Sequence, residues 1–399
     1  MLQKTEFQQI LSKRYLQNTI SDKIMKKILF VIPEYSHGGT NKSLENLLLF
    51  LNKEMYDLSI FCLYEDGGDY YKKVFAPYIL RKSKLYYWLH DNVYTRKIIG
   101  FFNKVTKREN FTLLYRREVR HLEKKHIFDI VIAYQEGTAT EFVSYFKNKN
   151  KIAWIHFDYA MLEGKVNLKK KKVYYDRFKH IVCVSKAALE SMLKVHPEYK
   201  EKSTYIYNTL NSASVNEASL KSMQVPFDST CFNIISIGRL VSIKQFQEIP
   251  KIVSNIKKQT SRPFCWYIIG SGSSEEWIRS EIEKYNVQDT VVLLGPKDNP
   301  YPFIRQANLL VCTSVAESFS YVIAEAKILH VPVLSNDFPV AHEVINESNG
   351  WVANLVEMPT SLSNIINNVN SIYKKKEEAI KNYEYSNEAI LNKINLLFG

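Results

Sequence analysis

The chain has 399 residues, a hydrophobic content of 46% and a formal net charge of +13. This length is typical of two domains of roughly 150 residues each, and the apolar content is ample for two cores. The longest apolar runs have the length of strands, and the N-terminus is polar, so we expect neither a transmembrane helix nor a secretory signal. The composition therefore predicts a globular, cytosolic protein.

The first half of the chain is expected to hold a helical extension over 1–24 and a domain over 25–210. Short apolar runs separated mostly by helical stretches predict six strands in this domain: Lys27–Ile32, Leu58–Leu63, Asp129–Tyr134, Ile152–His156, His180–Val184 and Thr204–Tyr207.

A polar stretch over 211–230, rich in Ser, Asn and Ala, is expected to be the linker to a second domain over 231–380. Five further apolar runs predict its strands: Asn233–Ile237, Cys265–Ile269, Val291–Leu294, Leu309–Cys312 and Val331–Leu334. Residues 381–399 are expected to form a last helix, and whether it packs back on the first domain stays open. The alternation of strands and helices predicts an α/β protein with two Rossmann-like domains.

The positive charge is concentrated between Arg81 and His126. This stretch contains 13 lysines and arginines and 4 acidic residues, which gives it a net charge of +9. Aromatic and aliphatic residues interleave with these cations, as on surfaces that dock to anionic membranes. A solvated helical face is the alternative. Nucleic acid is not expected as a partner, because no nucleic-acid module accompanies the segment.

The cysteines are scattered and show no metal-ligand spacing, which favours reduced core thiols. They are Cys62, Cys183, Cys231, Cys265 and Cys312.

Two glutamates, Glu317 and Glu325, flank the predicted junction between an apolar strand and an apolar helix. The unpaired N–H groups at that helix start, Phe319 to Val322, suit a phosphate. A sugar nucleotide offers a diphosphate for the helix end and hydroxyls for both carboxylates. An acidic helix cap beside a solvated glutamate is the alternative.

Other motifs also follow predicted strands, where α/β proteins bind ligands. Gly38 and Gly39 precede a helix and would let the backbone approach a ligand, although a tight turn is equally compatible. Arg239 and Lys244 are placed to bind a diphosphate, or are surface cations. The stretch from Gly270 to Gly272 is weak evidence alone, because it lacks the third glycine of the dinucleotide fingerprint.

Taken together and in order, these motifs resemble the retaining glycosyltransferases of family 4, the group 1 enzymes of the GT-B fold. The resemblance covers roughly Lys27 to Asn354 and rests on His37-Gly38-Gly39-Thr40, Trp154-Ile155-His156, Val184-Ser185, Ile237-Gly238-Arg239-Leu240 with Lys244, Ile269-Gly270-Ser271-Gly272, Leu294-Gly295, and Glu317 with Glu325. It implies two Rossmann-like domains facing each other across a cleft.

The resemblance also implies roles for individual residues. The glycine loop of Gly38 and Gly39 would lie over the donor diphosphate, which the cations of Arg239 and Lys244 would neutralise. Glu317 and His156 would be the catalytic residues that face the transferred sugar, and Glu325 would bind the ribose. The other expected donor contacts are Gly270, Pro296, Ser318, Phe319, Ser320 and Tyr321.

Three positions depart from the family pattern. Ser318 stands where many members have glycine, Asn208-Thr209-Leu210 replaces an Asn-Gly-Val or Asn-Gly-Ile turn, and His330 replaces a glycine. Serine at a helix start is an acceptable N-cap, so activity is still expected.

The expected function is transfer of a hexose or N-acetylhexosamine, with retention, from a nucleotide sugar to a saccharide acceptor in cell-surface polysaccharide synthesis, as in capsule, exopolysaccharide or lipopolysaccharide assembly. UDP is the expected carrier, with GDP-mannose as an alternative. The expected acceptor is polyprenyl-linked and is reached from the inner face of the membrane, and a soluble acceptor is the alternative. We expect no cofactor and no metal, since the helix start near Ser320, Gly39 and the two cations would stabilise the diphosphate charge in place of a metal. The absence of an Asp-x-Asp motif argues against a metal-dependent GT-A enzyme. A nucleotide-sugar epimerase of the same fold and an inactive nucleotide-binding scaffold are the competing interpretations.

Overall fold

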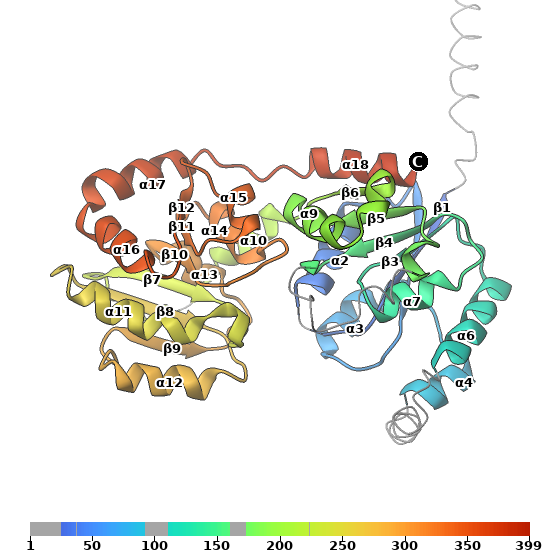
Figure 1. Cartoon of the computed structure of the whole chain (residues 1–399), viewed down its shortest axis with the longest axis horizontal. Coiled ribbons are helices and arrows are strands. Elements are labelled where there is room, and N and C mark those ends of the chain that lie inside the picture. The colour runs from blue at the N-terminus through green and yellow to red at the C-terminus, as the bar shows by residue number, and fades with distance from the viewer. Residues whose placement is uncertain (1–24, 37, 92–110, 160–172, 223) are drawn as a thin grey trace, which may run out of the picture. The chain divides into compact units, whose positions relative to one another are not determined.

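The computed structural model describes residues 25–36, 38–91, 111–159, 173–222 and 224–399 (Figure 1). The predicted extension over 1–24, and most of the stretch that separates Trp88 from α6 (Phe111–Lys125), lie outside the described residues.

The chain divides into two compact units, Met1–Trp154 with Val173–His180 and Ile155–Lys172 with Ile181–Gly399. Each contains elements of the predicted α/β type. None of the described helices is both long and apolar enough to cross a membrane.

The first sheet has six strands in the order β2-β1-β3-β4-β5-β6. They are β1 (Lys26–Ile32), β2 (Tyr56–Cys62), β3 (Ile130–Ala133), β4 (Lys151–Ile155), β5 (His180–Cys183) and β6 (Ser203–Tyr205). Every residue from Ile28 to Ile32 in β1 is fully buried, which is typical of a central parallel strand covered on both faces. Helix α2 (Gly39–Phe50) follows β1, and helices α6 and α7 (Thr138–Ser144) flank β3 along the chain.

The second sheet has the order β12-β11-β10-β7-β8-β9. Its strands are β7 (Phe232–Ile237), β8 (Phe264–Ile269), β9 (Val291–Gly295), β10 (Leu309–Cys312), β11 (Val333–Ser335) and β12 (Gly350–Val352), and each strand runs parallel to its neighbours.

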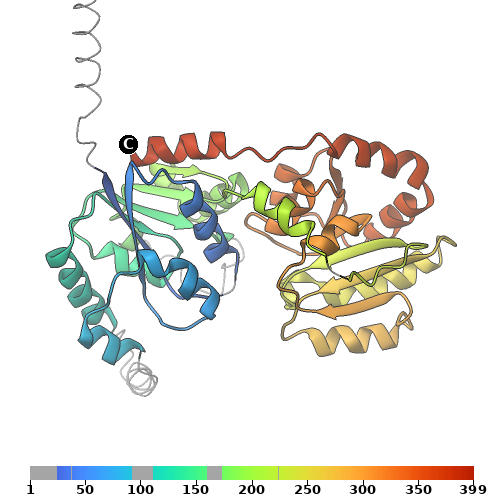
Figure 2. The same cartoon turned by 180° about the vertical axis from the view of Figure 1, so that it is seen from behind.

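Alternate strand residues of this sheet pack into two layers. Ile234, Trp266 and Val311 share one hydrophobic cluster with side chains of α11 (Ile249–Lys257), α12 (Glu275–Lys284) and α16 (Met358–Asn367). Because neighbouring residues point to opposite faces, Ile235 and Leu310 are buried on the other face. Helices α10 (Ser212–Ser219), α13 (Tyr301–Gln306) and α14 (Tyr321–Ile328) contact one another, and α14 also contacts β10 and β11 (Figures 1 and 2).

The prediction of an α/β protein with two Rossmann-like domains is confirmed, and all eleven predicted strands are present with ends shifted by at most two residues. Strand β12 was missed. The polar stretch expected as a linker contains helix α10, whose Val215 and Ser219 are buried, and the Asn299 side chain donates to the Ala218 carbonyl at 2.8 Å.

Strands β5 and β6 belong to the first sheet, although the compact units group residues 181–210 with the second unit, so the predicted bounds of the two domains stay a prediction. Contacts of residues 181–210 with the C-terminal part of the chain explain this grouping. The Tyr385 hydroxyl donates to the Asn208 carbonyl at 2.5 Å, and the Asn387 side chain bonds both the N–H and the carbonyl of Leu210, at 3.0 and 2.8 Å. The last helix, α18 (Glu388–Phe398), places the Lys393 ammonium 4.3 Å from the centre of the Tyr205 ring.

All five cysteines are free thiols, as predicted. Cys62, Cys183 and Cys312 are buried, whereas Cys231 and Cys265 are half-buried.

Candidate active site

The loop between β10 and α14 carries the first predicted carboxylate. Ser320 is the N-cap of α14 and has φ 63°, in the left-handed region that a non-glycine residue enters only at a cost. The residue is 6% exposed, and its hydroxyl has no hydrogen-bond partner among the described residues. A strained backbone and an unsatisfied buried hydroxyl at a helix start are features expected of a ligand site.

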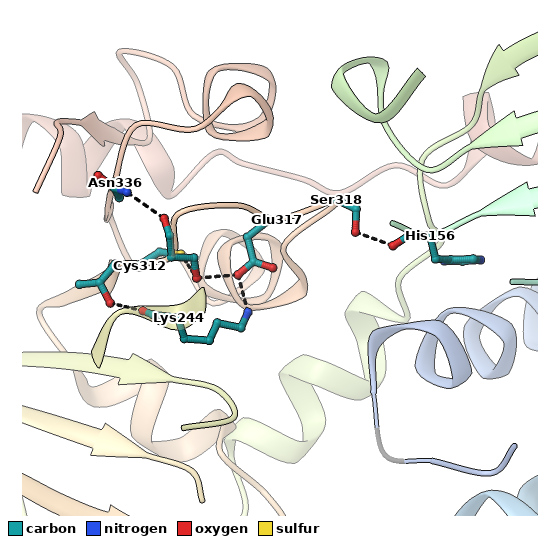
Figure 3. A network of polar contacts seen from close by, with 8 residues as sticks. His156, Lys244, Cys312, Glu317, Ser318 and Asn336 are labelled. Carbon is teal, nitrogen blue, oxygen red and sulfur yellow. Dashed lines mark hydrogen bonds and ion pairs between the residues drawn. The ribbon is translucent and has the colours of Figure 1, made fainter. Parts of the chain in front are cut away.

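The Glu317 carboxylate is held from two sides (Figure 3). It is ion-paired with the Lys244 ammonium and accepts a hydrogen bond of 2.8 Å from the Ser314 hydroxyl. Both charged side chains are mostly covered, with 14% of Glu317 and 20% of Lys244 exposed. The pair brings together two residues that the sequence assigned to the sugar and to the diphosphate.

Hydrogen bonds around this pair fix the loop. The Thr313 hydroxyl donates to the Lys244 carbonyl at 2.7 Å, and the Asn336 amide donates to the Ser314 carbonyl at 2.9 Å (Figure 3). Asn336 follows β11, so the carboxyl ends of neighbouring strands β10 and β11 both contribute to the site.

The second carboxylate, Glu325, lies within α14 and is only 5% exposed. It accepts a hydrogen bond of 3.2 Å from the hydroxyl of Tyr301, the first residue of α13. A carboxylate fixed by a tyrosine is set to accept further hydrogen bonds from hydroxyl groups of a ligand.

His156 directly follows β4 and belongs to the second unit. Burial lowers the pKa of its imidazole to about 3, so the ring is neutral near pH 7. Its carbonyl accepts a hydrogen bond of 2.6 Å from the Ser318 hydroxyl, which ties it to the residue after Glu317 (Figure 3).

The glycines after β8 have a packing role. Gly270 and Gly272 have φ +150° and +158°, and a Cβ would lie 1.8 Å from the Gly238 carbonyl oxygen and 2.4 Å from the Leu240 carbonyl oxygen, respectively. The loop after β8 therefore packs directly on the loop after β7, where Arg239 lies. This contact accounts for the glycines without a ligand, so the predicted donor contact of Gly270 stays a prediction.

Arg239 and Pro296 are exposed at the carboxyl ends of β7 and β9. Gly38 and Gly39 lie at the start of α2 in the first unit. Gly38 is extended, with φ −175°, and a Cβ there would meet nothing within 4 Å. The space beside this backbone is open to a ligand, and the roles of these residues remain predictions.

The side chains of Phe319 and Tyr321 pack together, with their ring centroids 5.0 Å apart, and the Phe319 ring is 6.4 Å from that of Tyr207. A donor contact of Phe319 would therefore use its backbone N–H, because its side chain is buried. Sequence reasoning missed Ser314 and Tyr301, which donate to the two carboxylates, and Asn336, which donates to the Ser314 carbonyl. Only Ser314 was open to prediction, since it lies three residues before Glu317.

Two parallel six-stranded sheets with helices match the two Rossmann-like domains of GT-B glycosyltransferases. A family model described as Glycosyltransferase Family 4 matches residues 37–213, and one described as Glycosyl transferases group 1 matches residues 221–387. The chain belongs to these group 1, family 4 glycosyltransferases.

Similar proteins support this assignment. An uncharacterized glycosyltransferase of Methanocaldococcus jannaschii is 25% identical over 41% of each chain. The amylovoran biosynthesis glycosyltransferase AmsD of Erwinia amylovora is 21% identical over 82% of this chain and 86% of its own. An N-acetylgalactosaminyltransferase of Campylobacter jejuni, named for a diphospho-undecaprenol substrate, is 23% identical over 41% of this chain and 42% of its own. Among solved structures, HepE of Anabaena in complex with UDP and glucose has a TM-score of 0.71 at 15% identity, covering 93% of this chain and 98% of HepE, which shows the shared fold.

Proposed function

We propose that this glycosyltransferase transfers a hexose or N-acetylhexosamine from a UDP-sugar to a saccharide acceptor, with retention of configuration, in cell-surface polysaccharide synthesis. The observation that carries the proposal is the Glu317 carboxylate, held by Lys244 and Ser314 next to the strained start of α14. The UDP in the HepE complex and the polysaccharide named for AmsD support the donor and the pathway class.

In this proposal the diphosphate binds at the start of α14. The helix N–H groups and the Ser320 hydroxyl would donate to it, and the cations of Arg239 and Lys244 would neutralise it. Lys244 would then share its ammonium between the phosphate and Glu317. These groups together would stabilise the charge of the leaving nucleotide without a metal ion.

Glu317 and His156 would address the sugar, and Glu325 the ribose. The neutral imidazole of His156 has one N–H donor and one nitrogen acceptor, both suited to sugar hydroxyls. The Lys244 and Ser314 contacts stabilise the negative charge on Glu317, which makes it a poor nucleophile. This favours front-face transfer over a covalent sugar intermediate.

In the front-face step the bond between the anomeric carbon and the diphosphate oxygen breaks. The acceptor oxygen forms its bond to the same carbon from the same face. The acceptor proton moves to the departing phosphate oxygen, so the products are the glycoside and the nucleoside diphosphate.

A donor screen tests this function. Purified protein is incubated with membrane extract and each UDP- and GDP-sugar in turn, and nucleotide release is measured with and without EDTA. We expect nucleotide release from one UDP-sugar, at a rate that EDTA does not change. We also expect NMR to show the same anomeric configuration in the product linkage as in the donor sugar. Release from GDP-mannose alone would contradict the UDP assignment, and inversion in the product would contradict retention.

We further propose a lipid-linked acceptor at the inner face of the membrane, in line with the diphospho-undecaprenol named for the Campylobacter relative. Helix α6 supports this, because Arg117, Arg120, Lys124 and Lys125 are exposed along it and Leu113 is 76% exposed. Each cation near an anionic membrane surface contributes about 1 kcal/mol.

Liposome co-sedimentation tests the docking of α6. We expect binding to anionic liposomes at low salt, weakened when Arg117, Arg120 and Lys124 are changed to Gln. The matched control changes three exposed cations of the second unit, Lys251, Lys258 and Arg262, to Gln. Equal loss of binding in both triple variants would show a net-charge effect and contradict a docking role of α6.

A further inference from the structure

A single hydroxyl joins the two stretches that carry the predicted catalytic residues. The Ser318 side chain is adjacent to Glu317 and donates to the carbonyl of His156 at 2.6 Å, across 162 residues of sequence (Figure 3). Both residues lie in the second unit. The acceptor is a main-chain atom, so the bond fixes the backbone from which the imidazole projects.

Each partner is also fixed on its other side. Glu317 is held by Lys244 and Ser314, and two residues after His156 the Asp158 carboxylate accepts a hydrogen bond from the hydroxyl of Ser191. The Ser318 bond connects these two ordered stretches directly. A glycine, which many family members have after the first glutamate, has no side chain to make it.

We infer that Ser318 is a positioning residue, which holds the His156 imidazole in register with the Glu317 carboxylate during sugar transfer. The inference rests on the proposed function for its activity readout. Its contribution acts through His156 and not through nucleotide binding, since its hydroxyl is engaged with the His156 carbonyl.

A double-mutant cycle tests this. In the wild-type background, Ser318→Ala is expected to lower kcat roughly three- to tenfold, the effect of one lost hydrogen bond, with the Kd for UDP unchanged. In a His156→Ala background, the same substitution is expected to have no further effect, because the imidazole that it positions is absent. Ser318→Thr keeps a hydroxyl and is expected to restore most of the wild-type kcat.

Ser191→Ala is the matched control, because it also removes one hydroxyl bond to the stretch after β4. Its effect on kcat is expected to be the same in both backgrounds. Equal losses for Ser318→Ala in both backgrounds, or a background dependence shared by Ser191→Ala, would overturn the positioning role.

Hydrogen–deuterium exchange provides a readout that needs no substrate. Amides of residues 155–159 are expected to exchange faster in Ser318→Ala than in the wild type, and unchanged exchange would show that the bond is absent in solution. If the wild type transfers no sugar while exchange responds as expected, the proposed function fails and the contact stands. An active wild type with an additive double-mutant cycle refutes the inference alone.

Discussion

The loops after β8 and β10 follow strands of the same sheet, and both contain residues with positive φ, but for different reasons. After β8, the positive φ values of Gly270 and Gly272 are explained by a neighbouring backbone that leaves no room for a Cβ. After β10, the positive φ of Ser320 accompanies a buried hydroxyl without a partner in the described residues and a carboxylate, Glu317, held by a lysine. Unusual geometry explained by packing belongs to the scaffold, whereas unusual geometry beside unsatisfied polar groups indicates a ligand site.

The largest expected effect comes from adding a side chain at Gly270. Gly270→Ala would place a Cβ 1.8 Å from the Gly238 carbonyl oxygen, so the two loops must separate. We expect a loss of more than about 4 kcal/mol in the free energy of unfolding, measured by urea denaturation. Gly38→Ala is the control, with open space at its Cβ and an expected change within about 0.5 kcal/mol. A Gly270→Ala variant as stable as the wild type would break the distinction between the loops.

In the loop after β10, by contrast, a substitution should lower activity and leave stability unchanged. Glu317→Gln retains a hydrogen-bond acceptor for Ser314 and is expected to fold normally, while turnover falls roughly 10²- to 10³-fold through lost transition-state stabilisation. Affinity for UDP should hold or tighten, because Lys244 is released from its ion pair. Circular dichroism checks the fold, and calorimetry the affinity. A folded variant with full turnover would mean that the reaction centre lies elsewhere.

The second carboxylate separates binding from turnover. Glu325→Ala is expected to weaken UDP binding by about 1.5–3 kcal/mol, the cost of a lost hydrogen bond to a charged group. Calorimetric titration measures this. Tyr301→Phe removes the hydroxyl that holds the carboxylate but keeps the charge, so a smaller loss is expected. Wild-type affinity in Glu325→Ala would rule out the ribose contact.

Sequence patterns predicted the scaffold more completely than the site. Buried parallel strands are continuous apolar runs, so eleven strands could be predicted directly. Strand β12 (Gly350–Val352) was missed because it begins at a glycine after a polar stretch and has only Trp351 and Val352 as apolar strand residues. Helix α10 was not predicted, because its buried residues are only Val215 and Ser219 and give no clear apolar periodicity. Within the site, the motifs named Glu317 and Lys244 but not their ion pair, which depends on bringing together residues 73 positions apart.

Glycine shows the same limit. The family resemblance predicts Gly270 as a donor contact, because this glycine follows a strand in a known motif. Only the fold reveals the Gly238 carbonyl that lies against it. Contacts between loops depend on tertiary structure, and a motif cannot distinguish a glycine needed for a ligand from one needed for packing.

The pH dependence of stability tests the burial of His156, which contacts the loop after β10 through Ser318. Burial lowers the pKa of its imidazole from 6.5 to about 3, so between these values the unfolded chain binds a proton that the folded chain does not. Stability should therefore fall as pH drops below 6.5, by up to about 1.4 kcal/mol per pH unit from this residue. We expect a shallower fall between pH 6.5 and 5 for His156→Gln in urea denaturation. Identical slopes in both proteins would show that His156 titrates normally.

The smallest expected effect has opposite signs for stability and for binding. Ser320 adopts φ 63°, which glycine tolerates without a Cβ clash, so Ser320→Gly should relieve strain of about 1 kcal/mol and raise the melting temperature slightly. The same change removes the buried hydroxyl that we expect to donate to the donor diphosphate, so UDP affinity should fall roughly threefold or more. Stability gained together with affinity lost would place Ser320 with the ligand-binding geometry. If Ser320→Gly instead leaves UDP affinity unchanged while destabilising the protein, the Ser320 hydroxyl serves the fold, and the contrast between the loops after β8 and β10 no longer holds at this position.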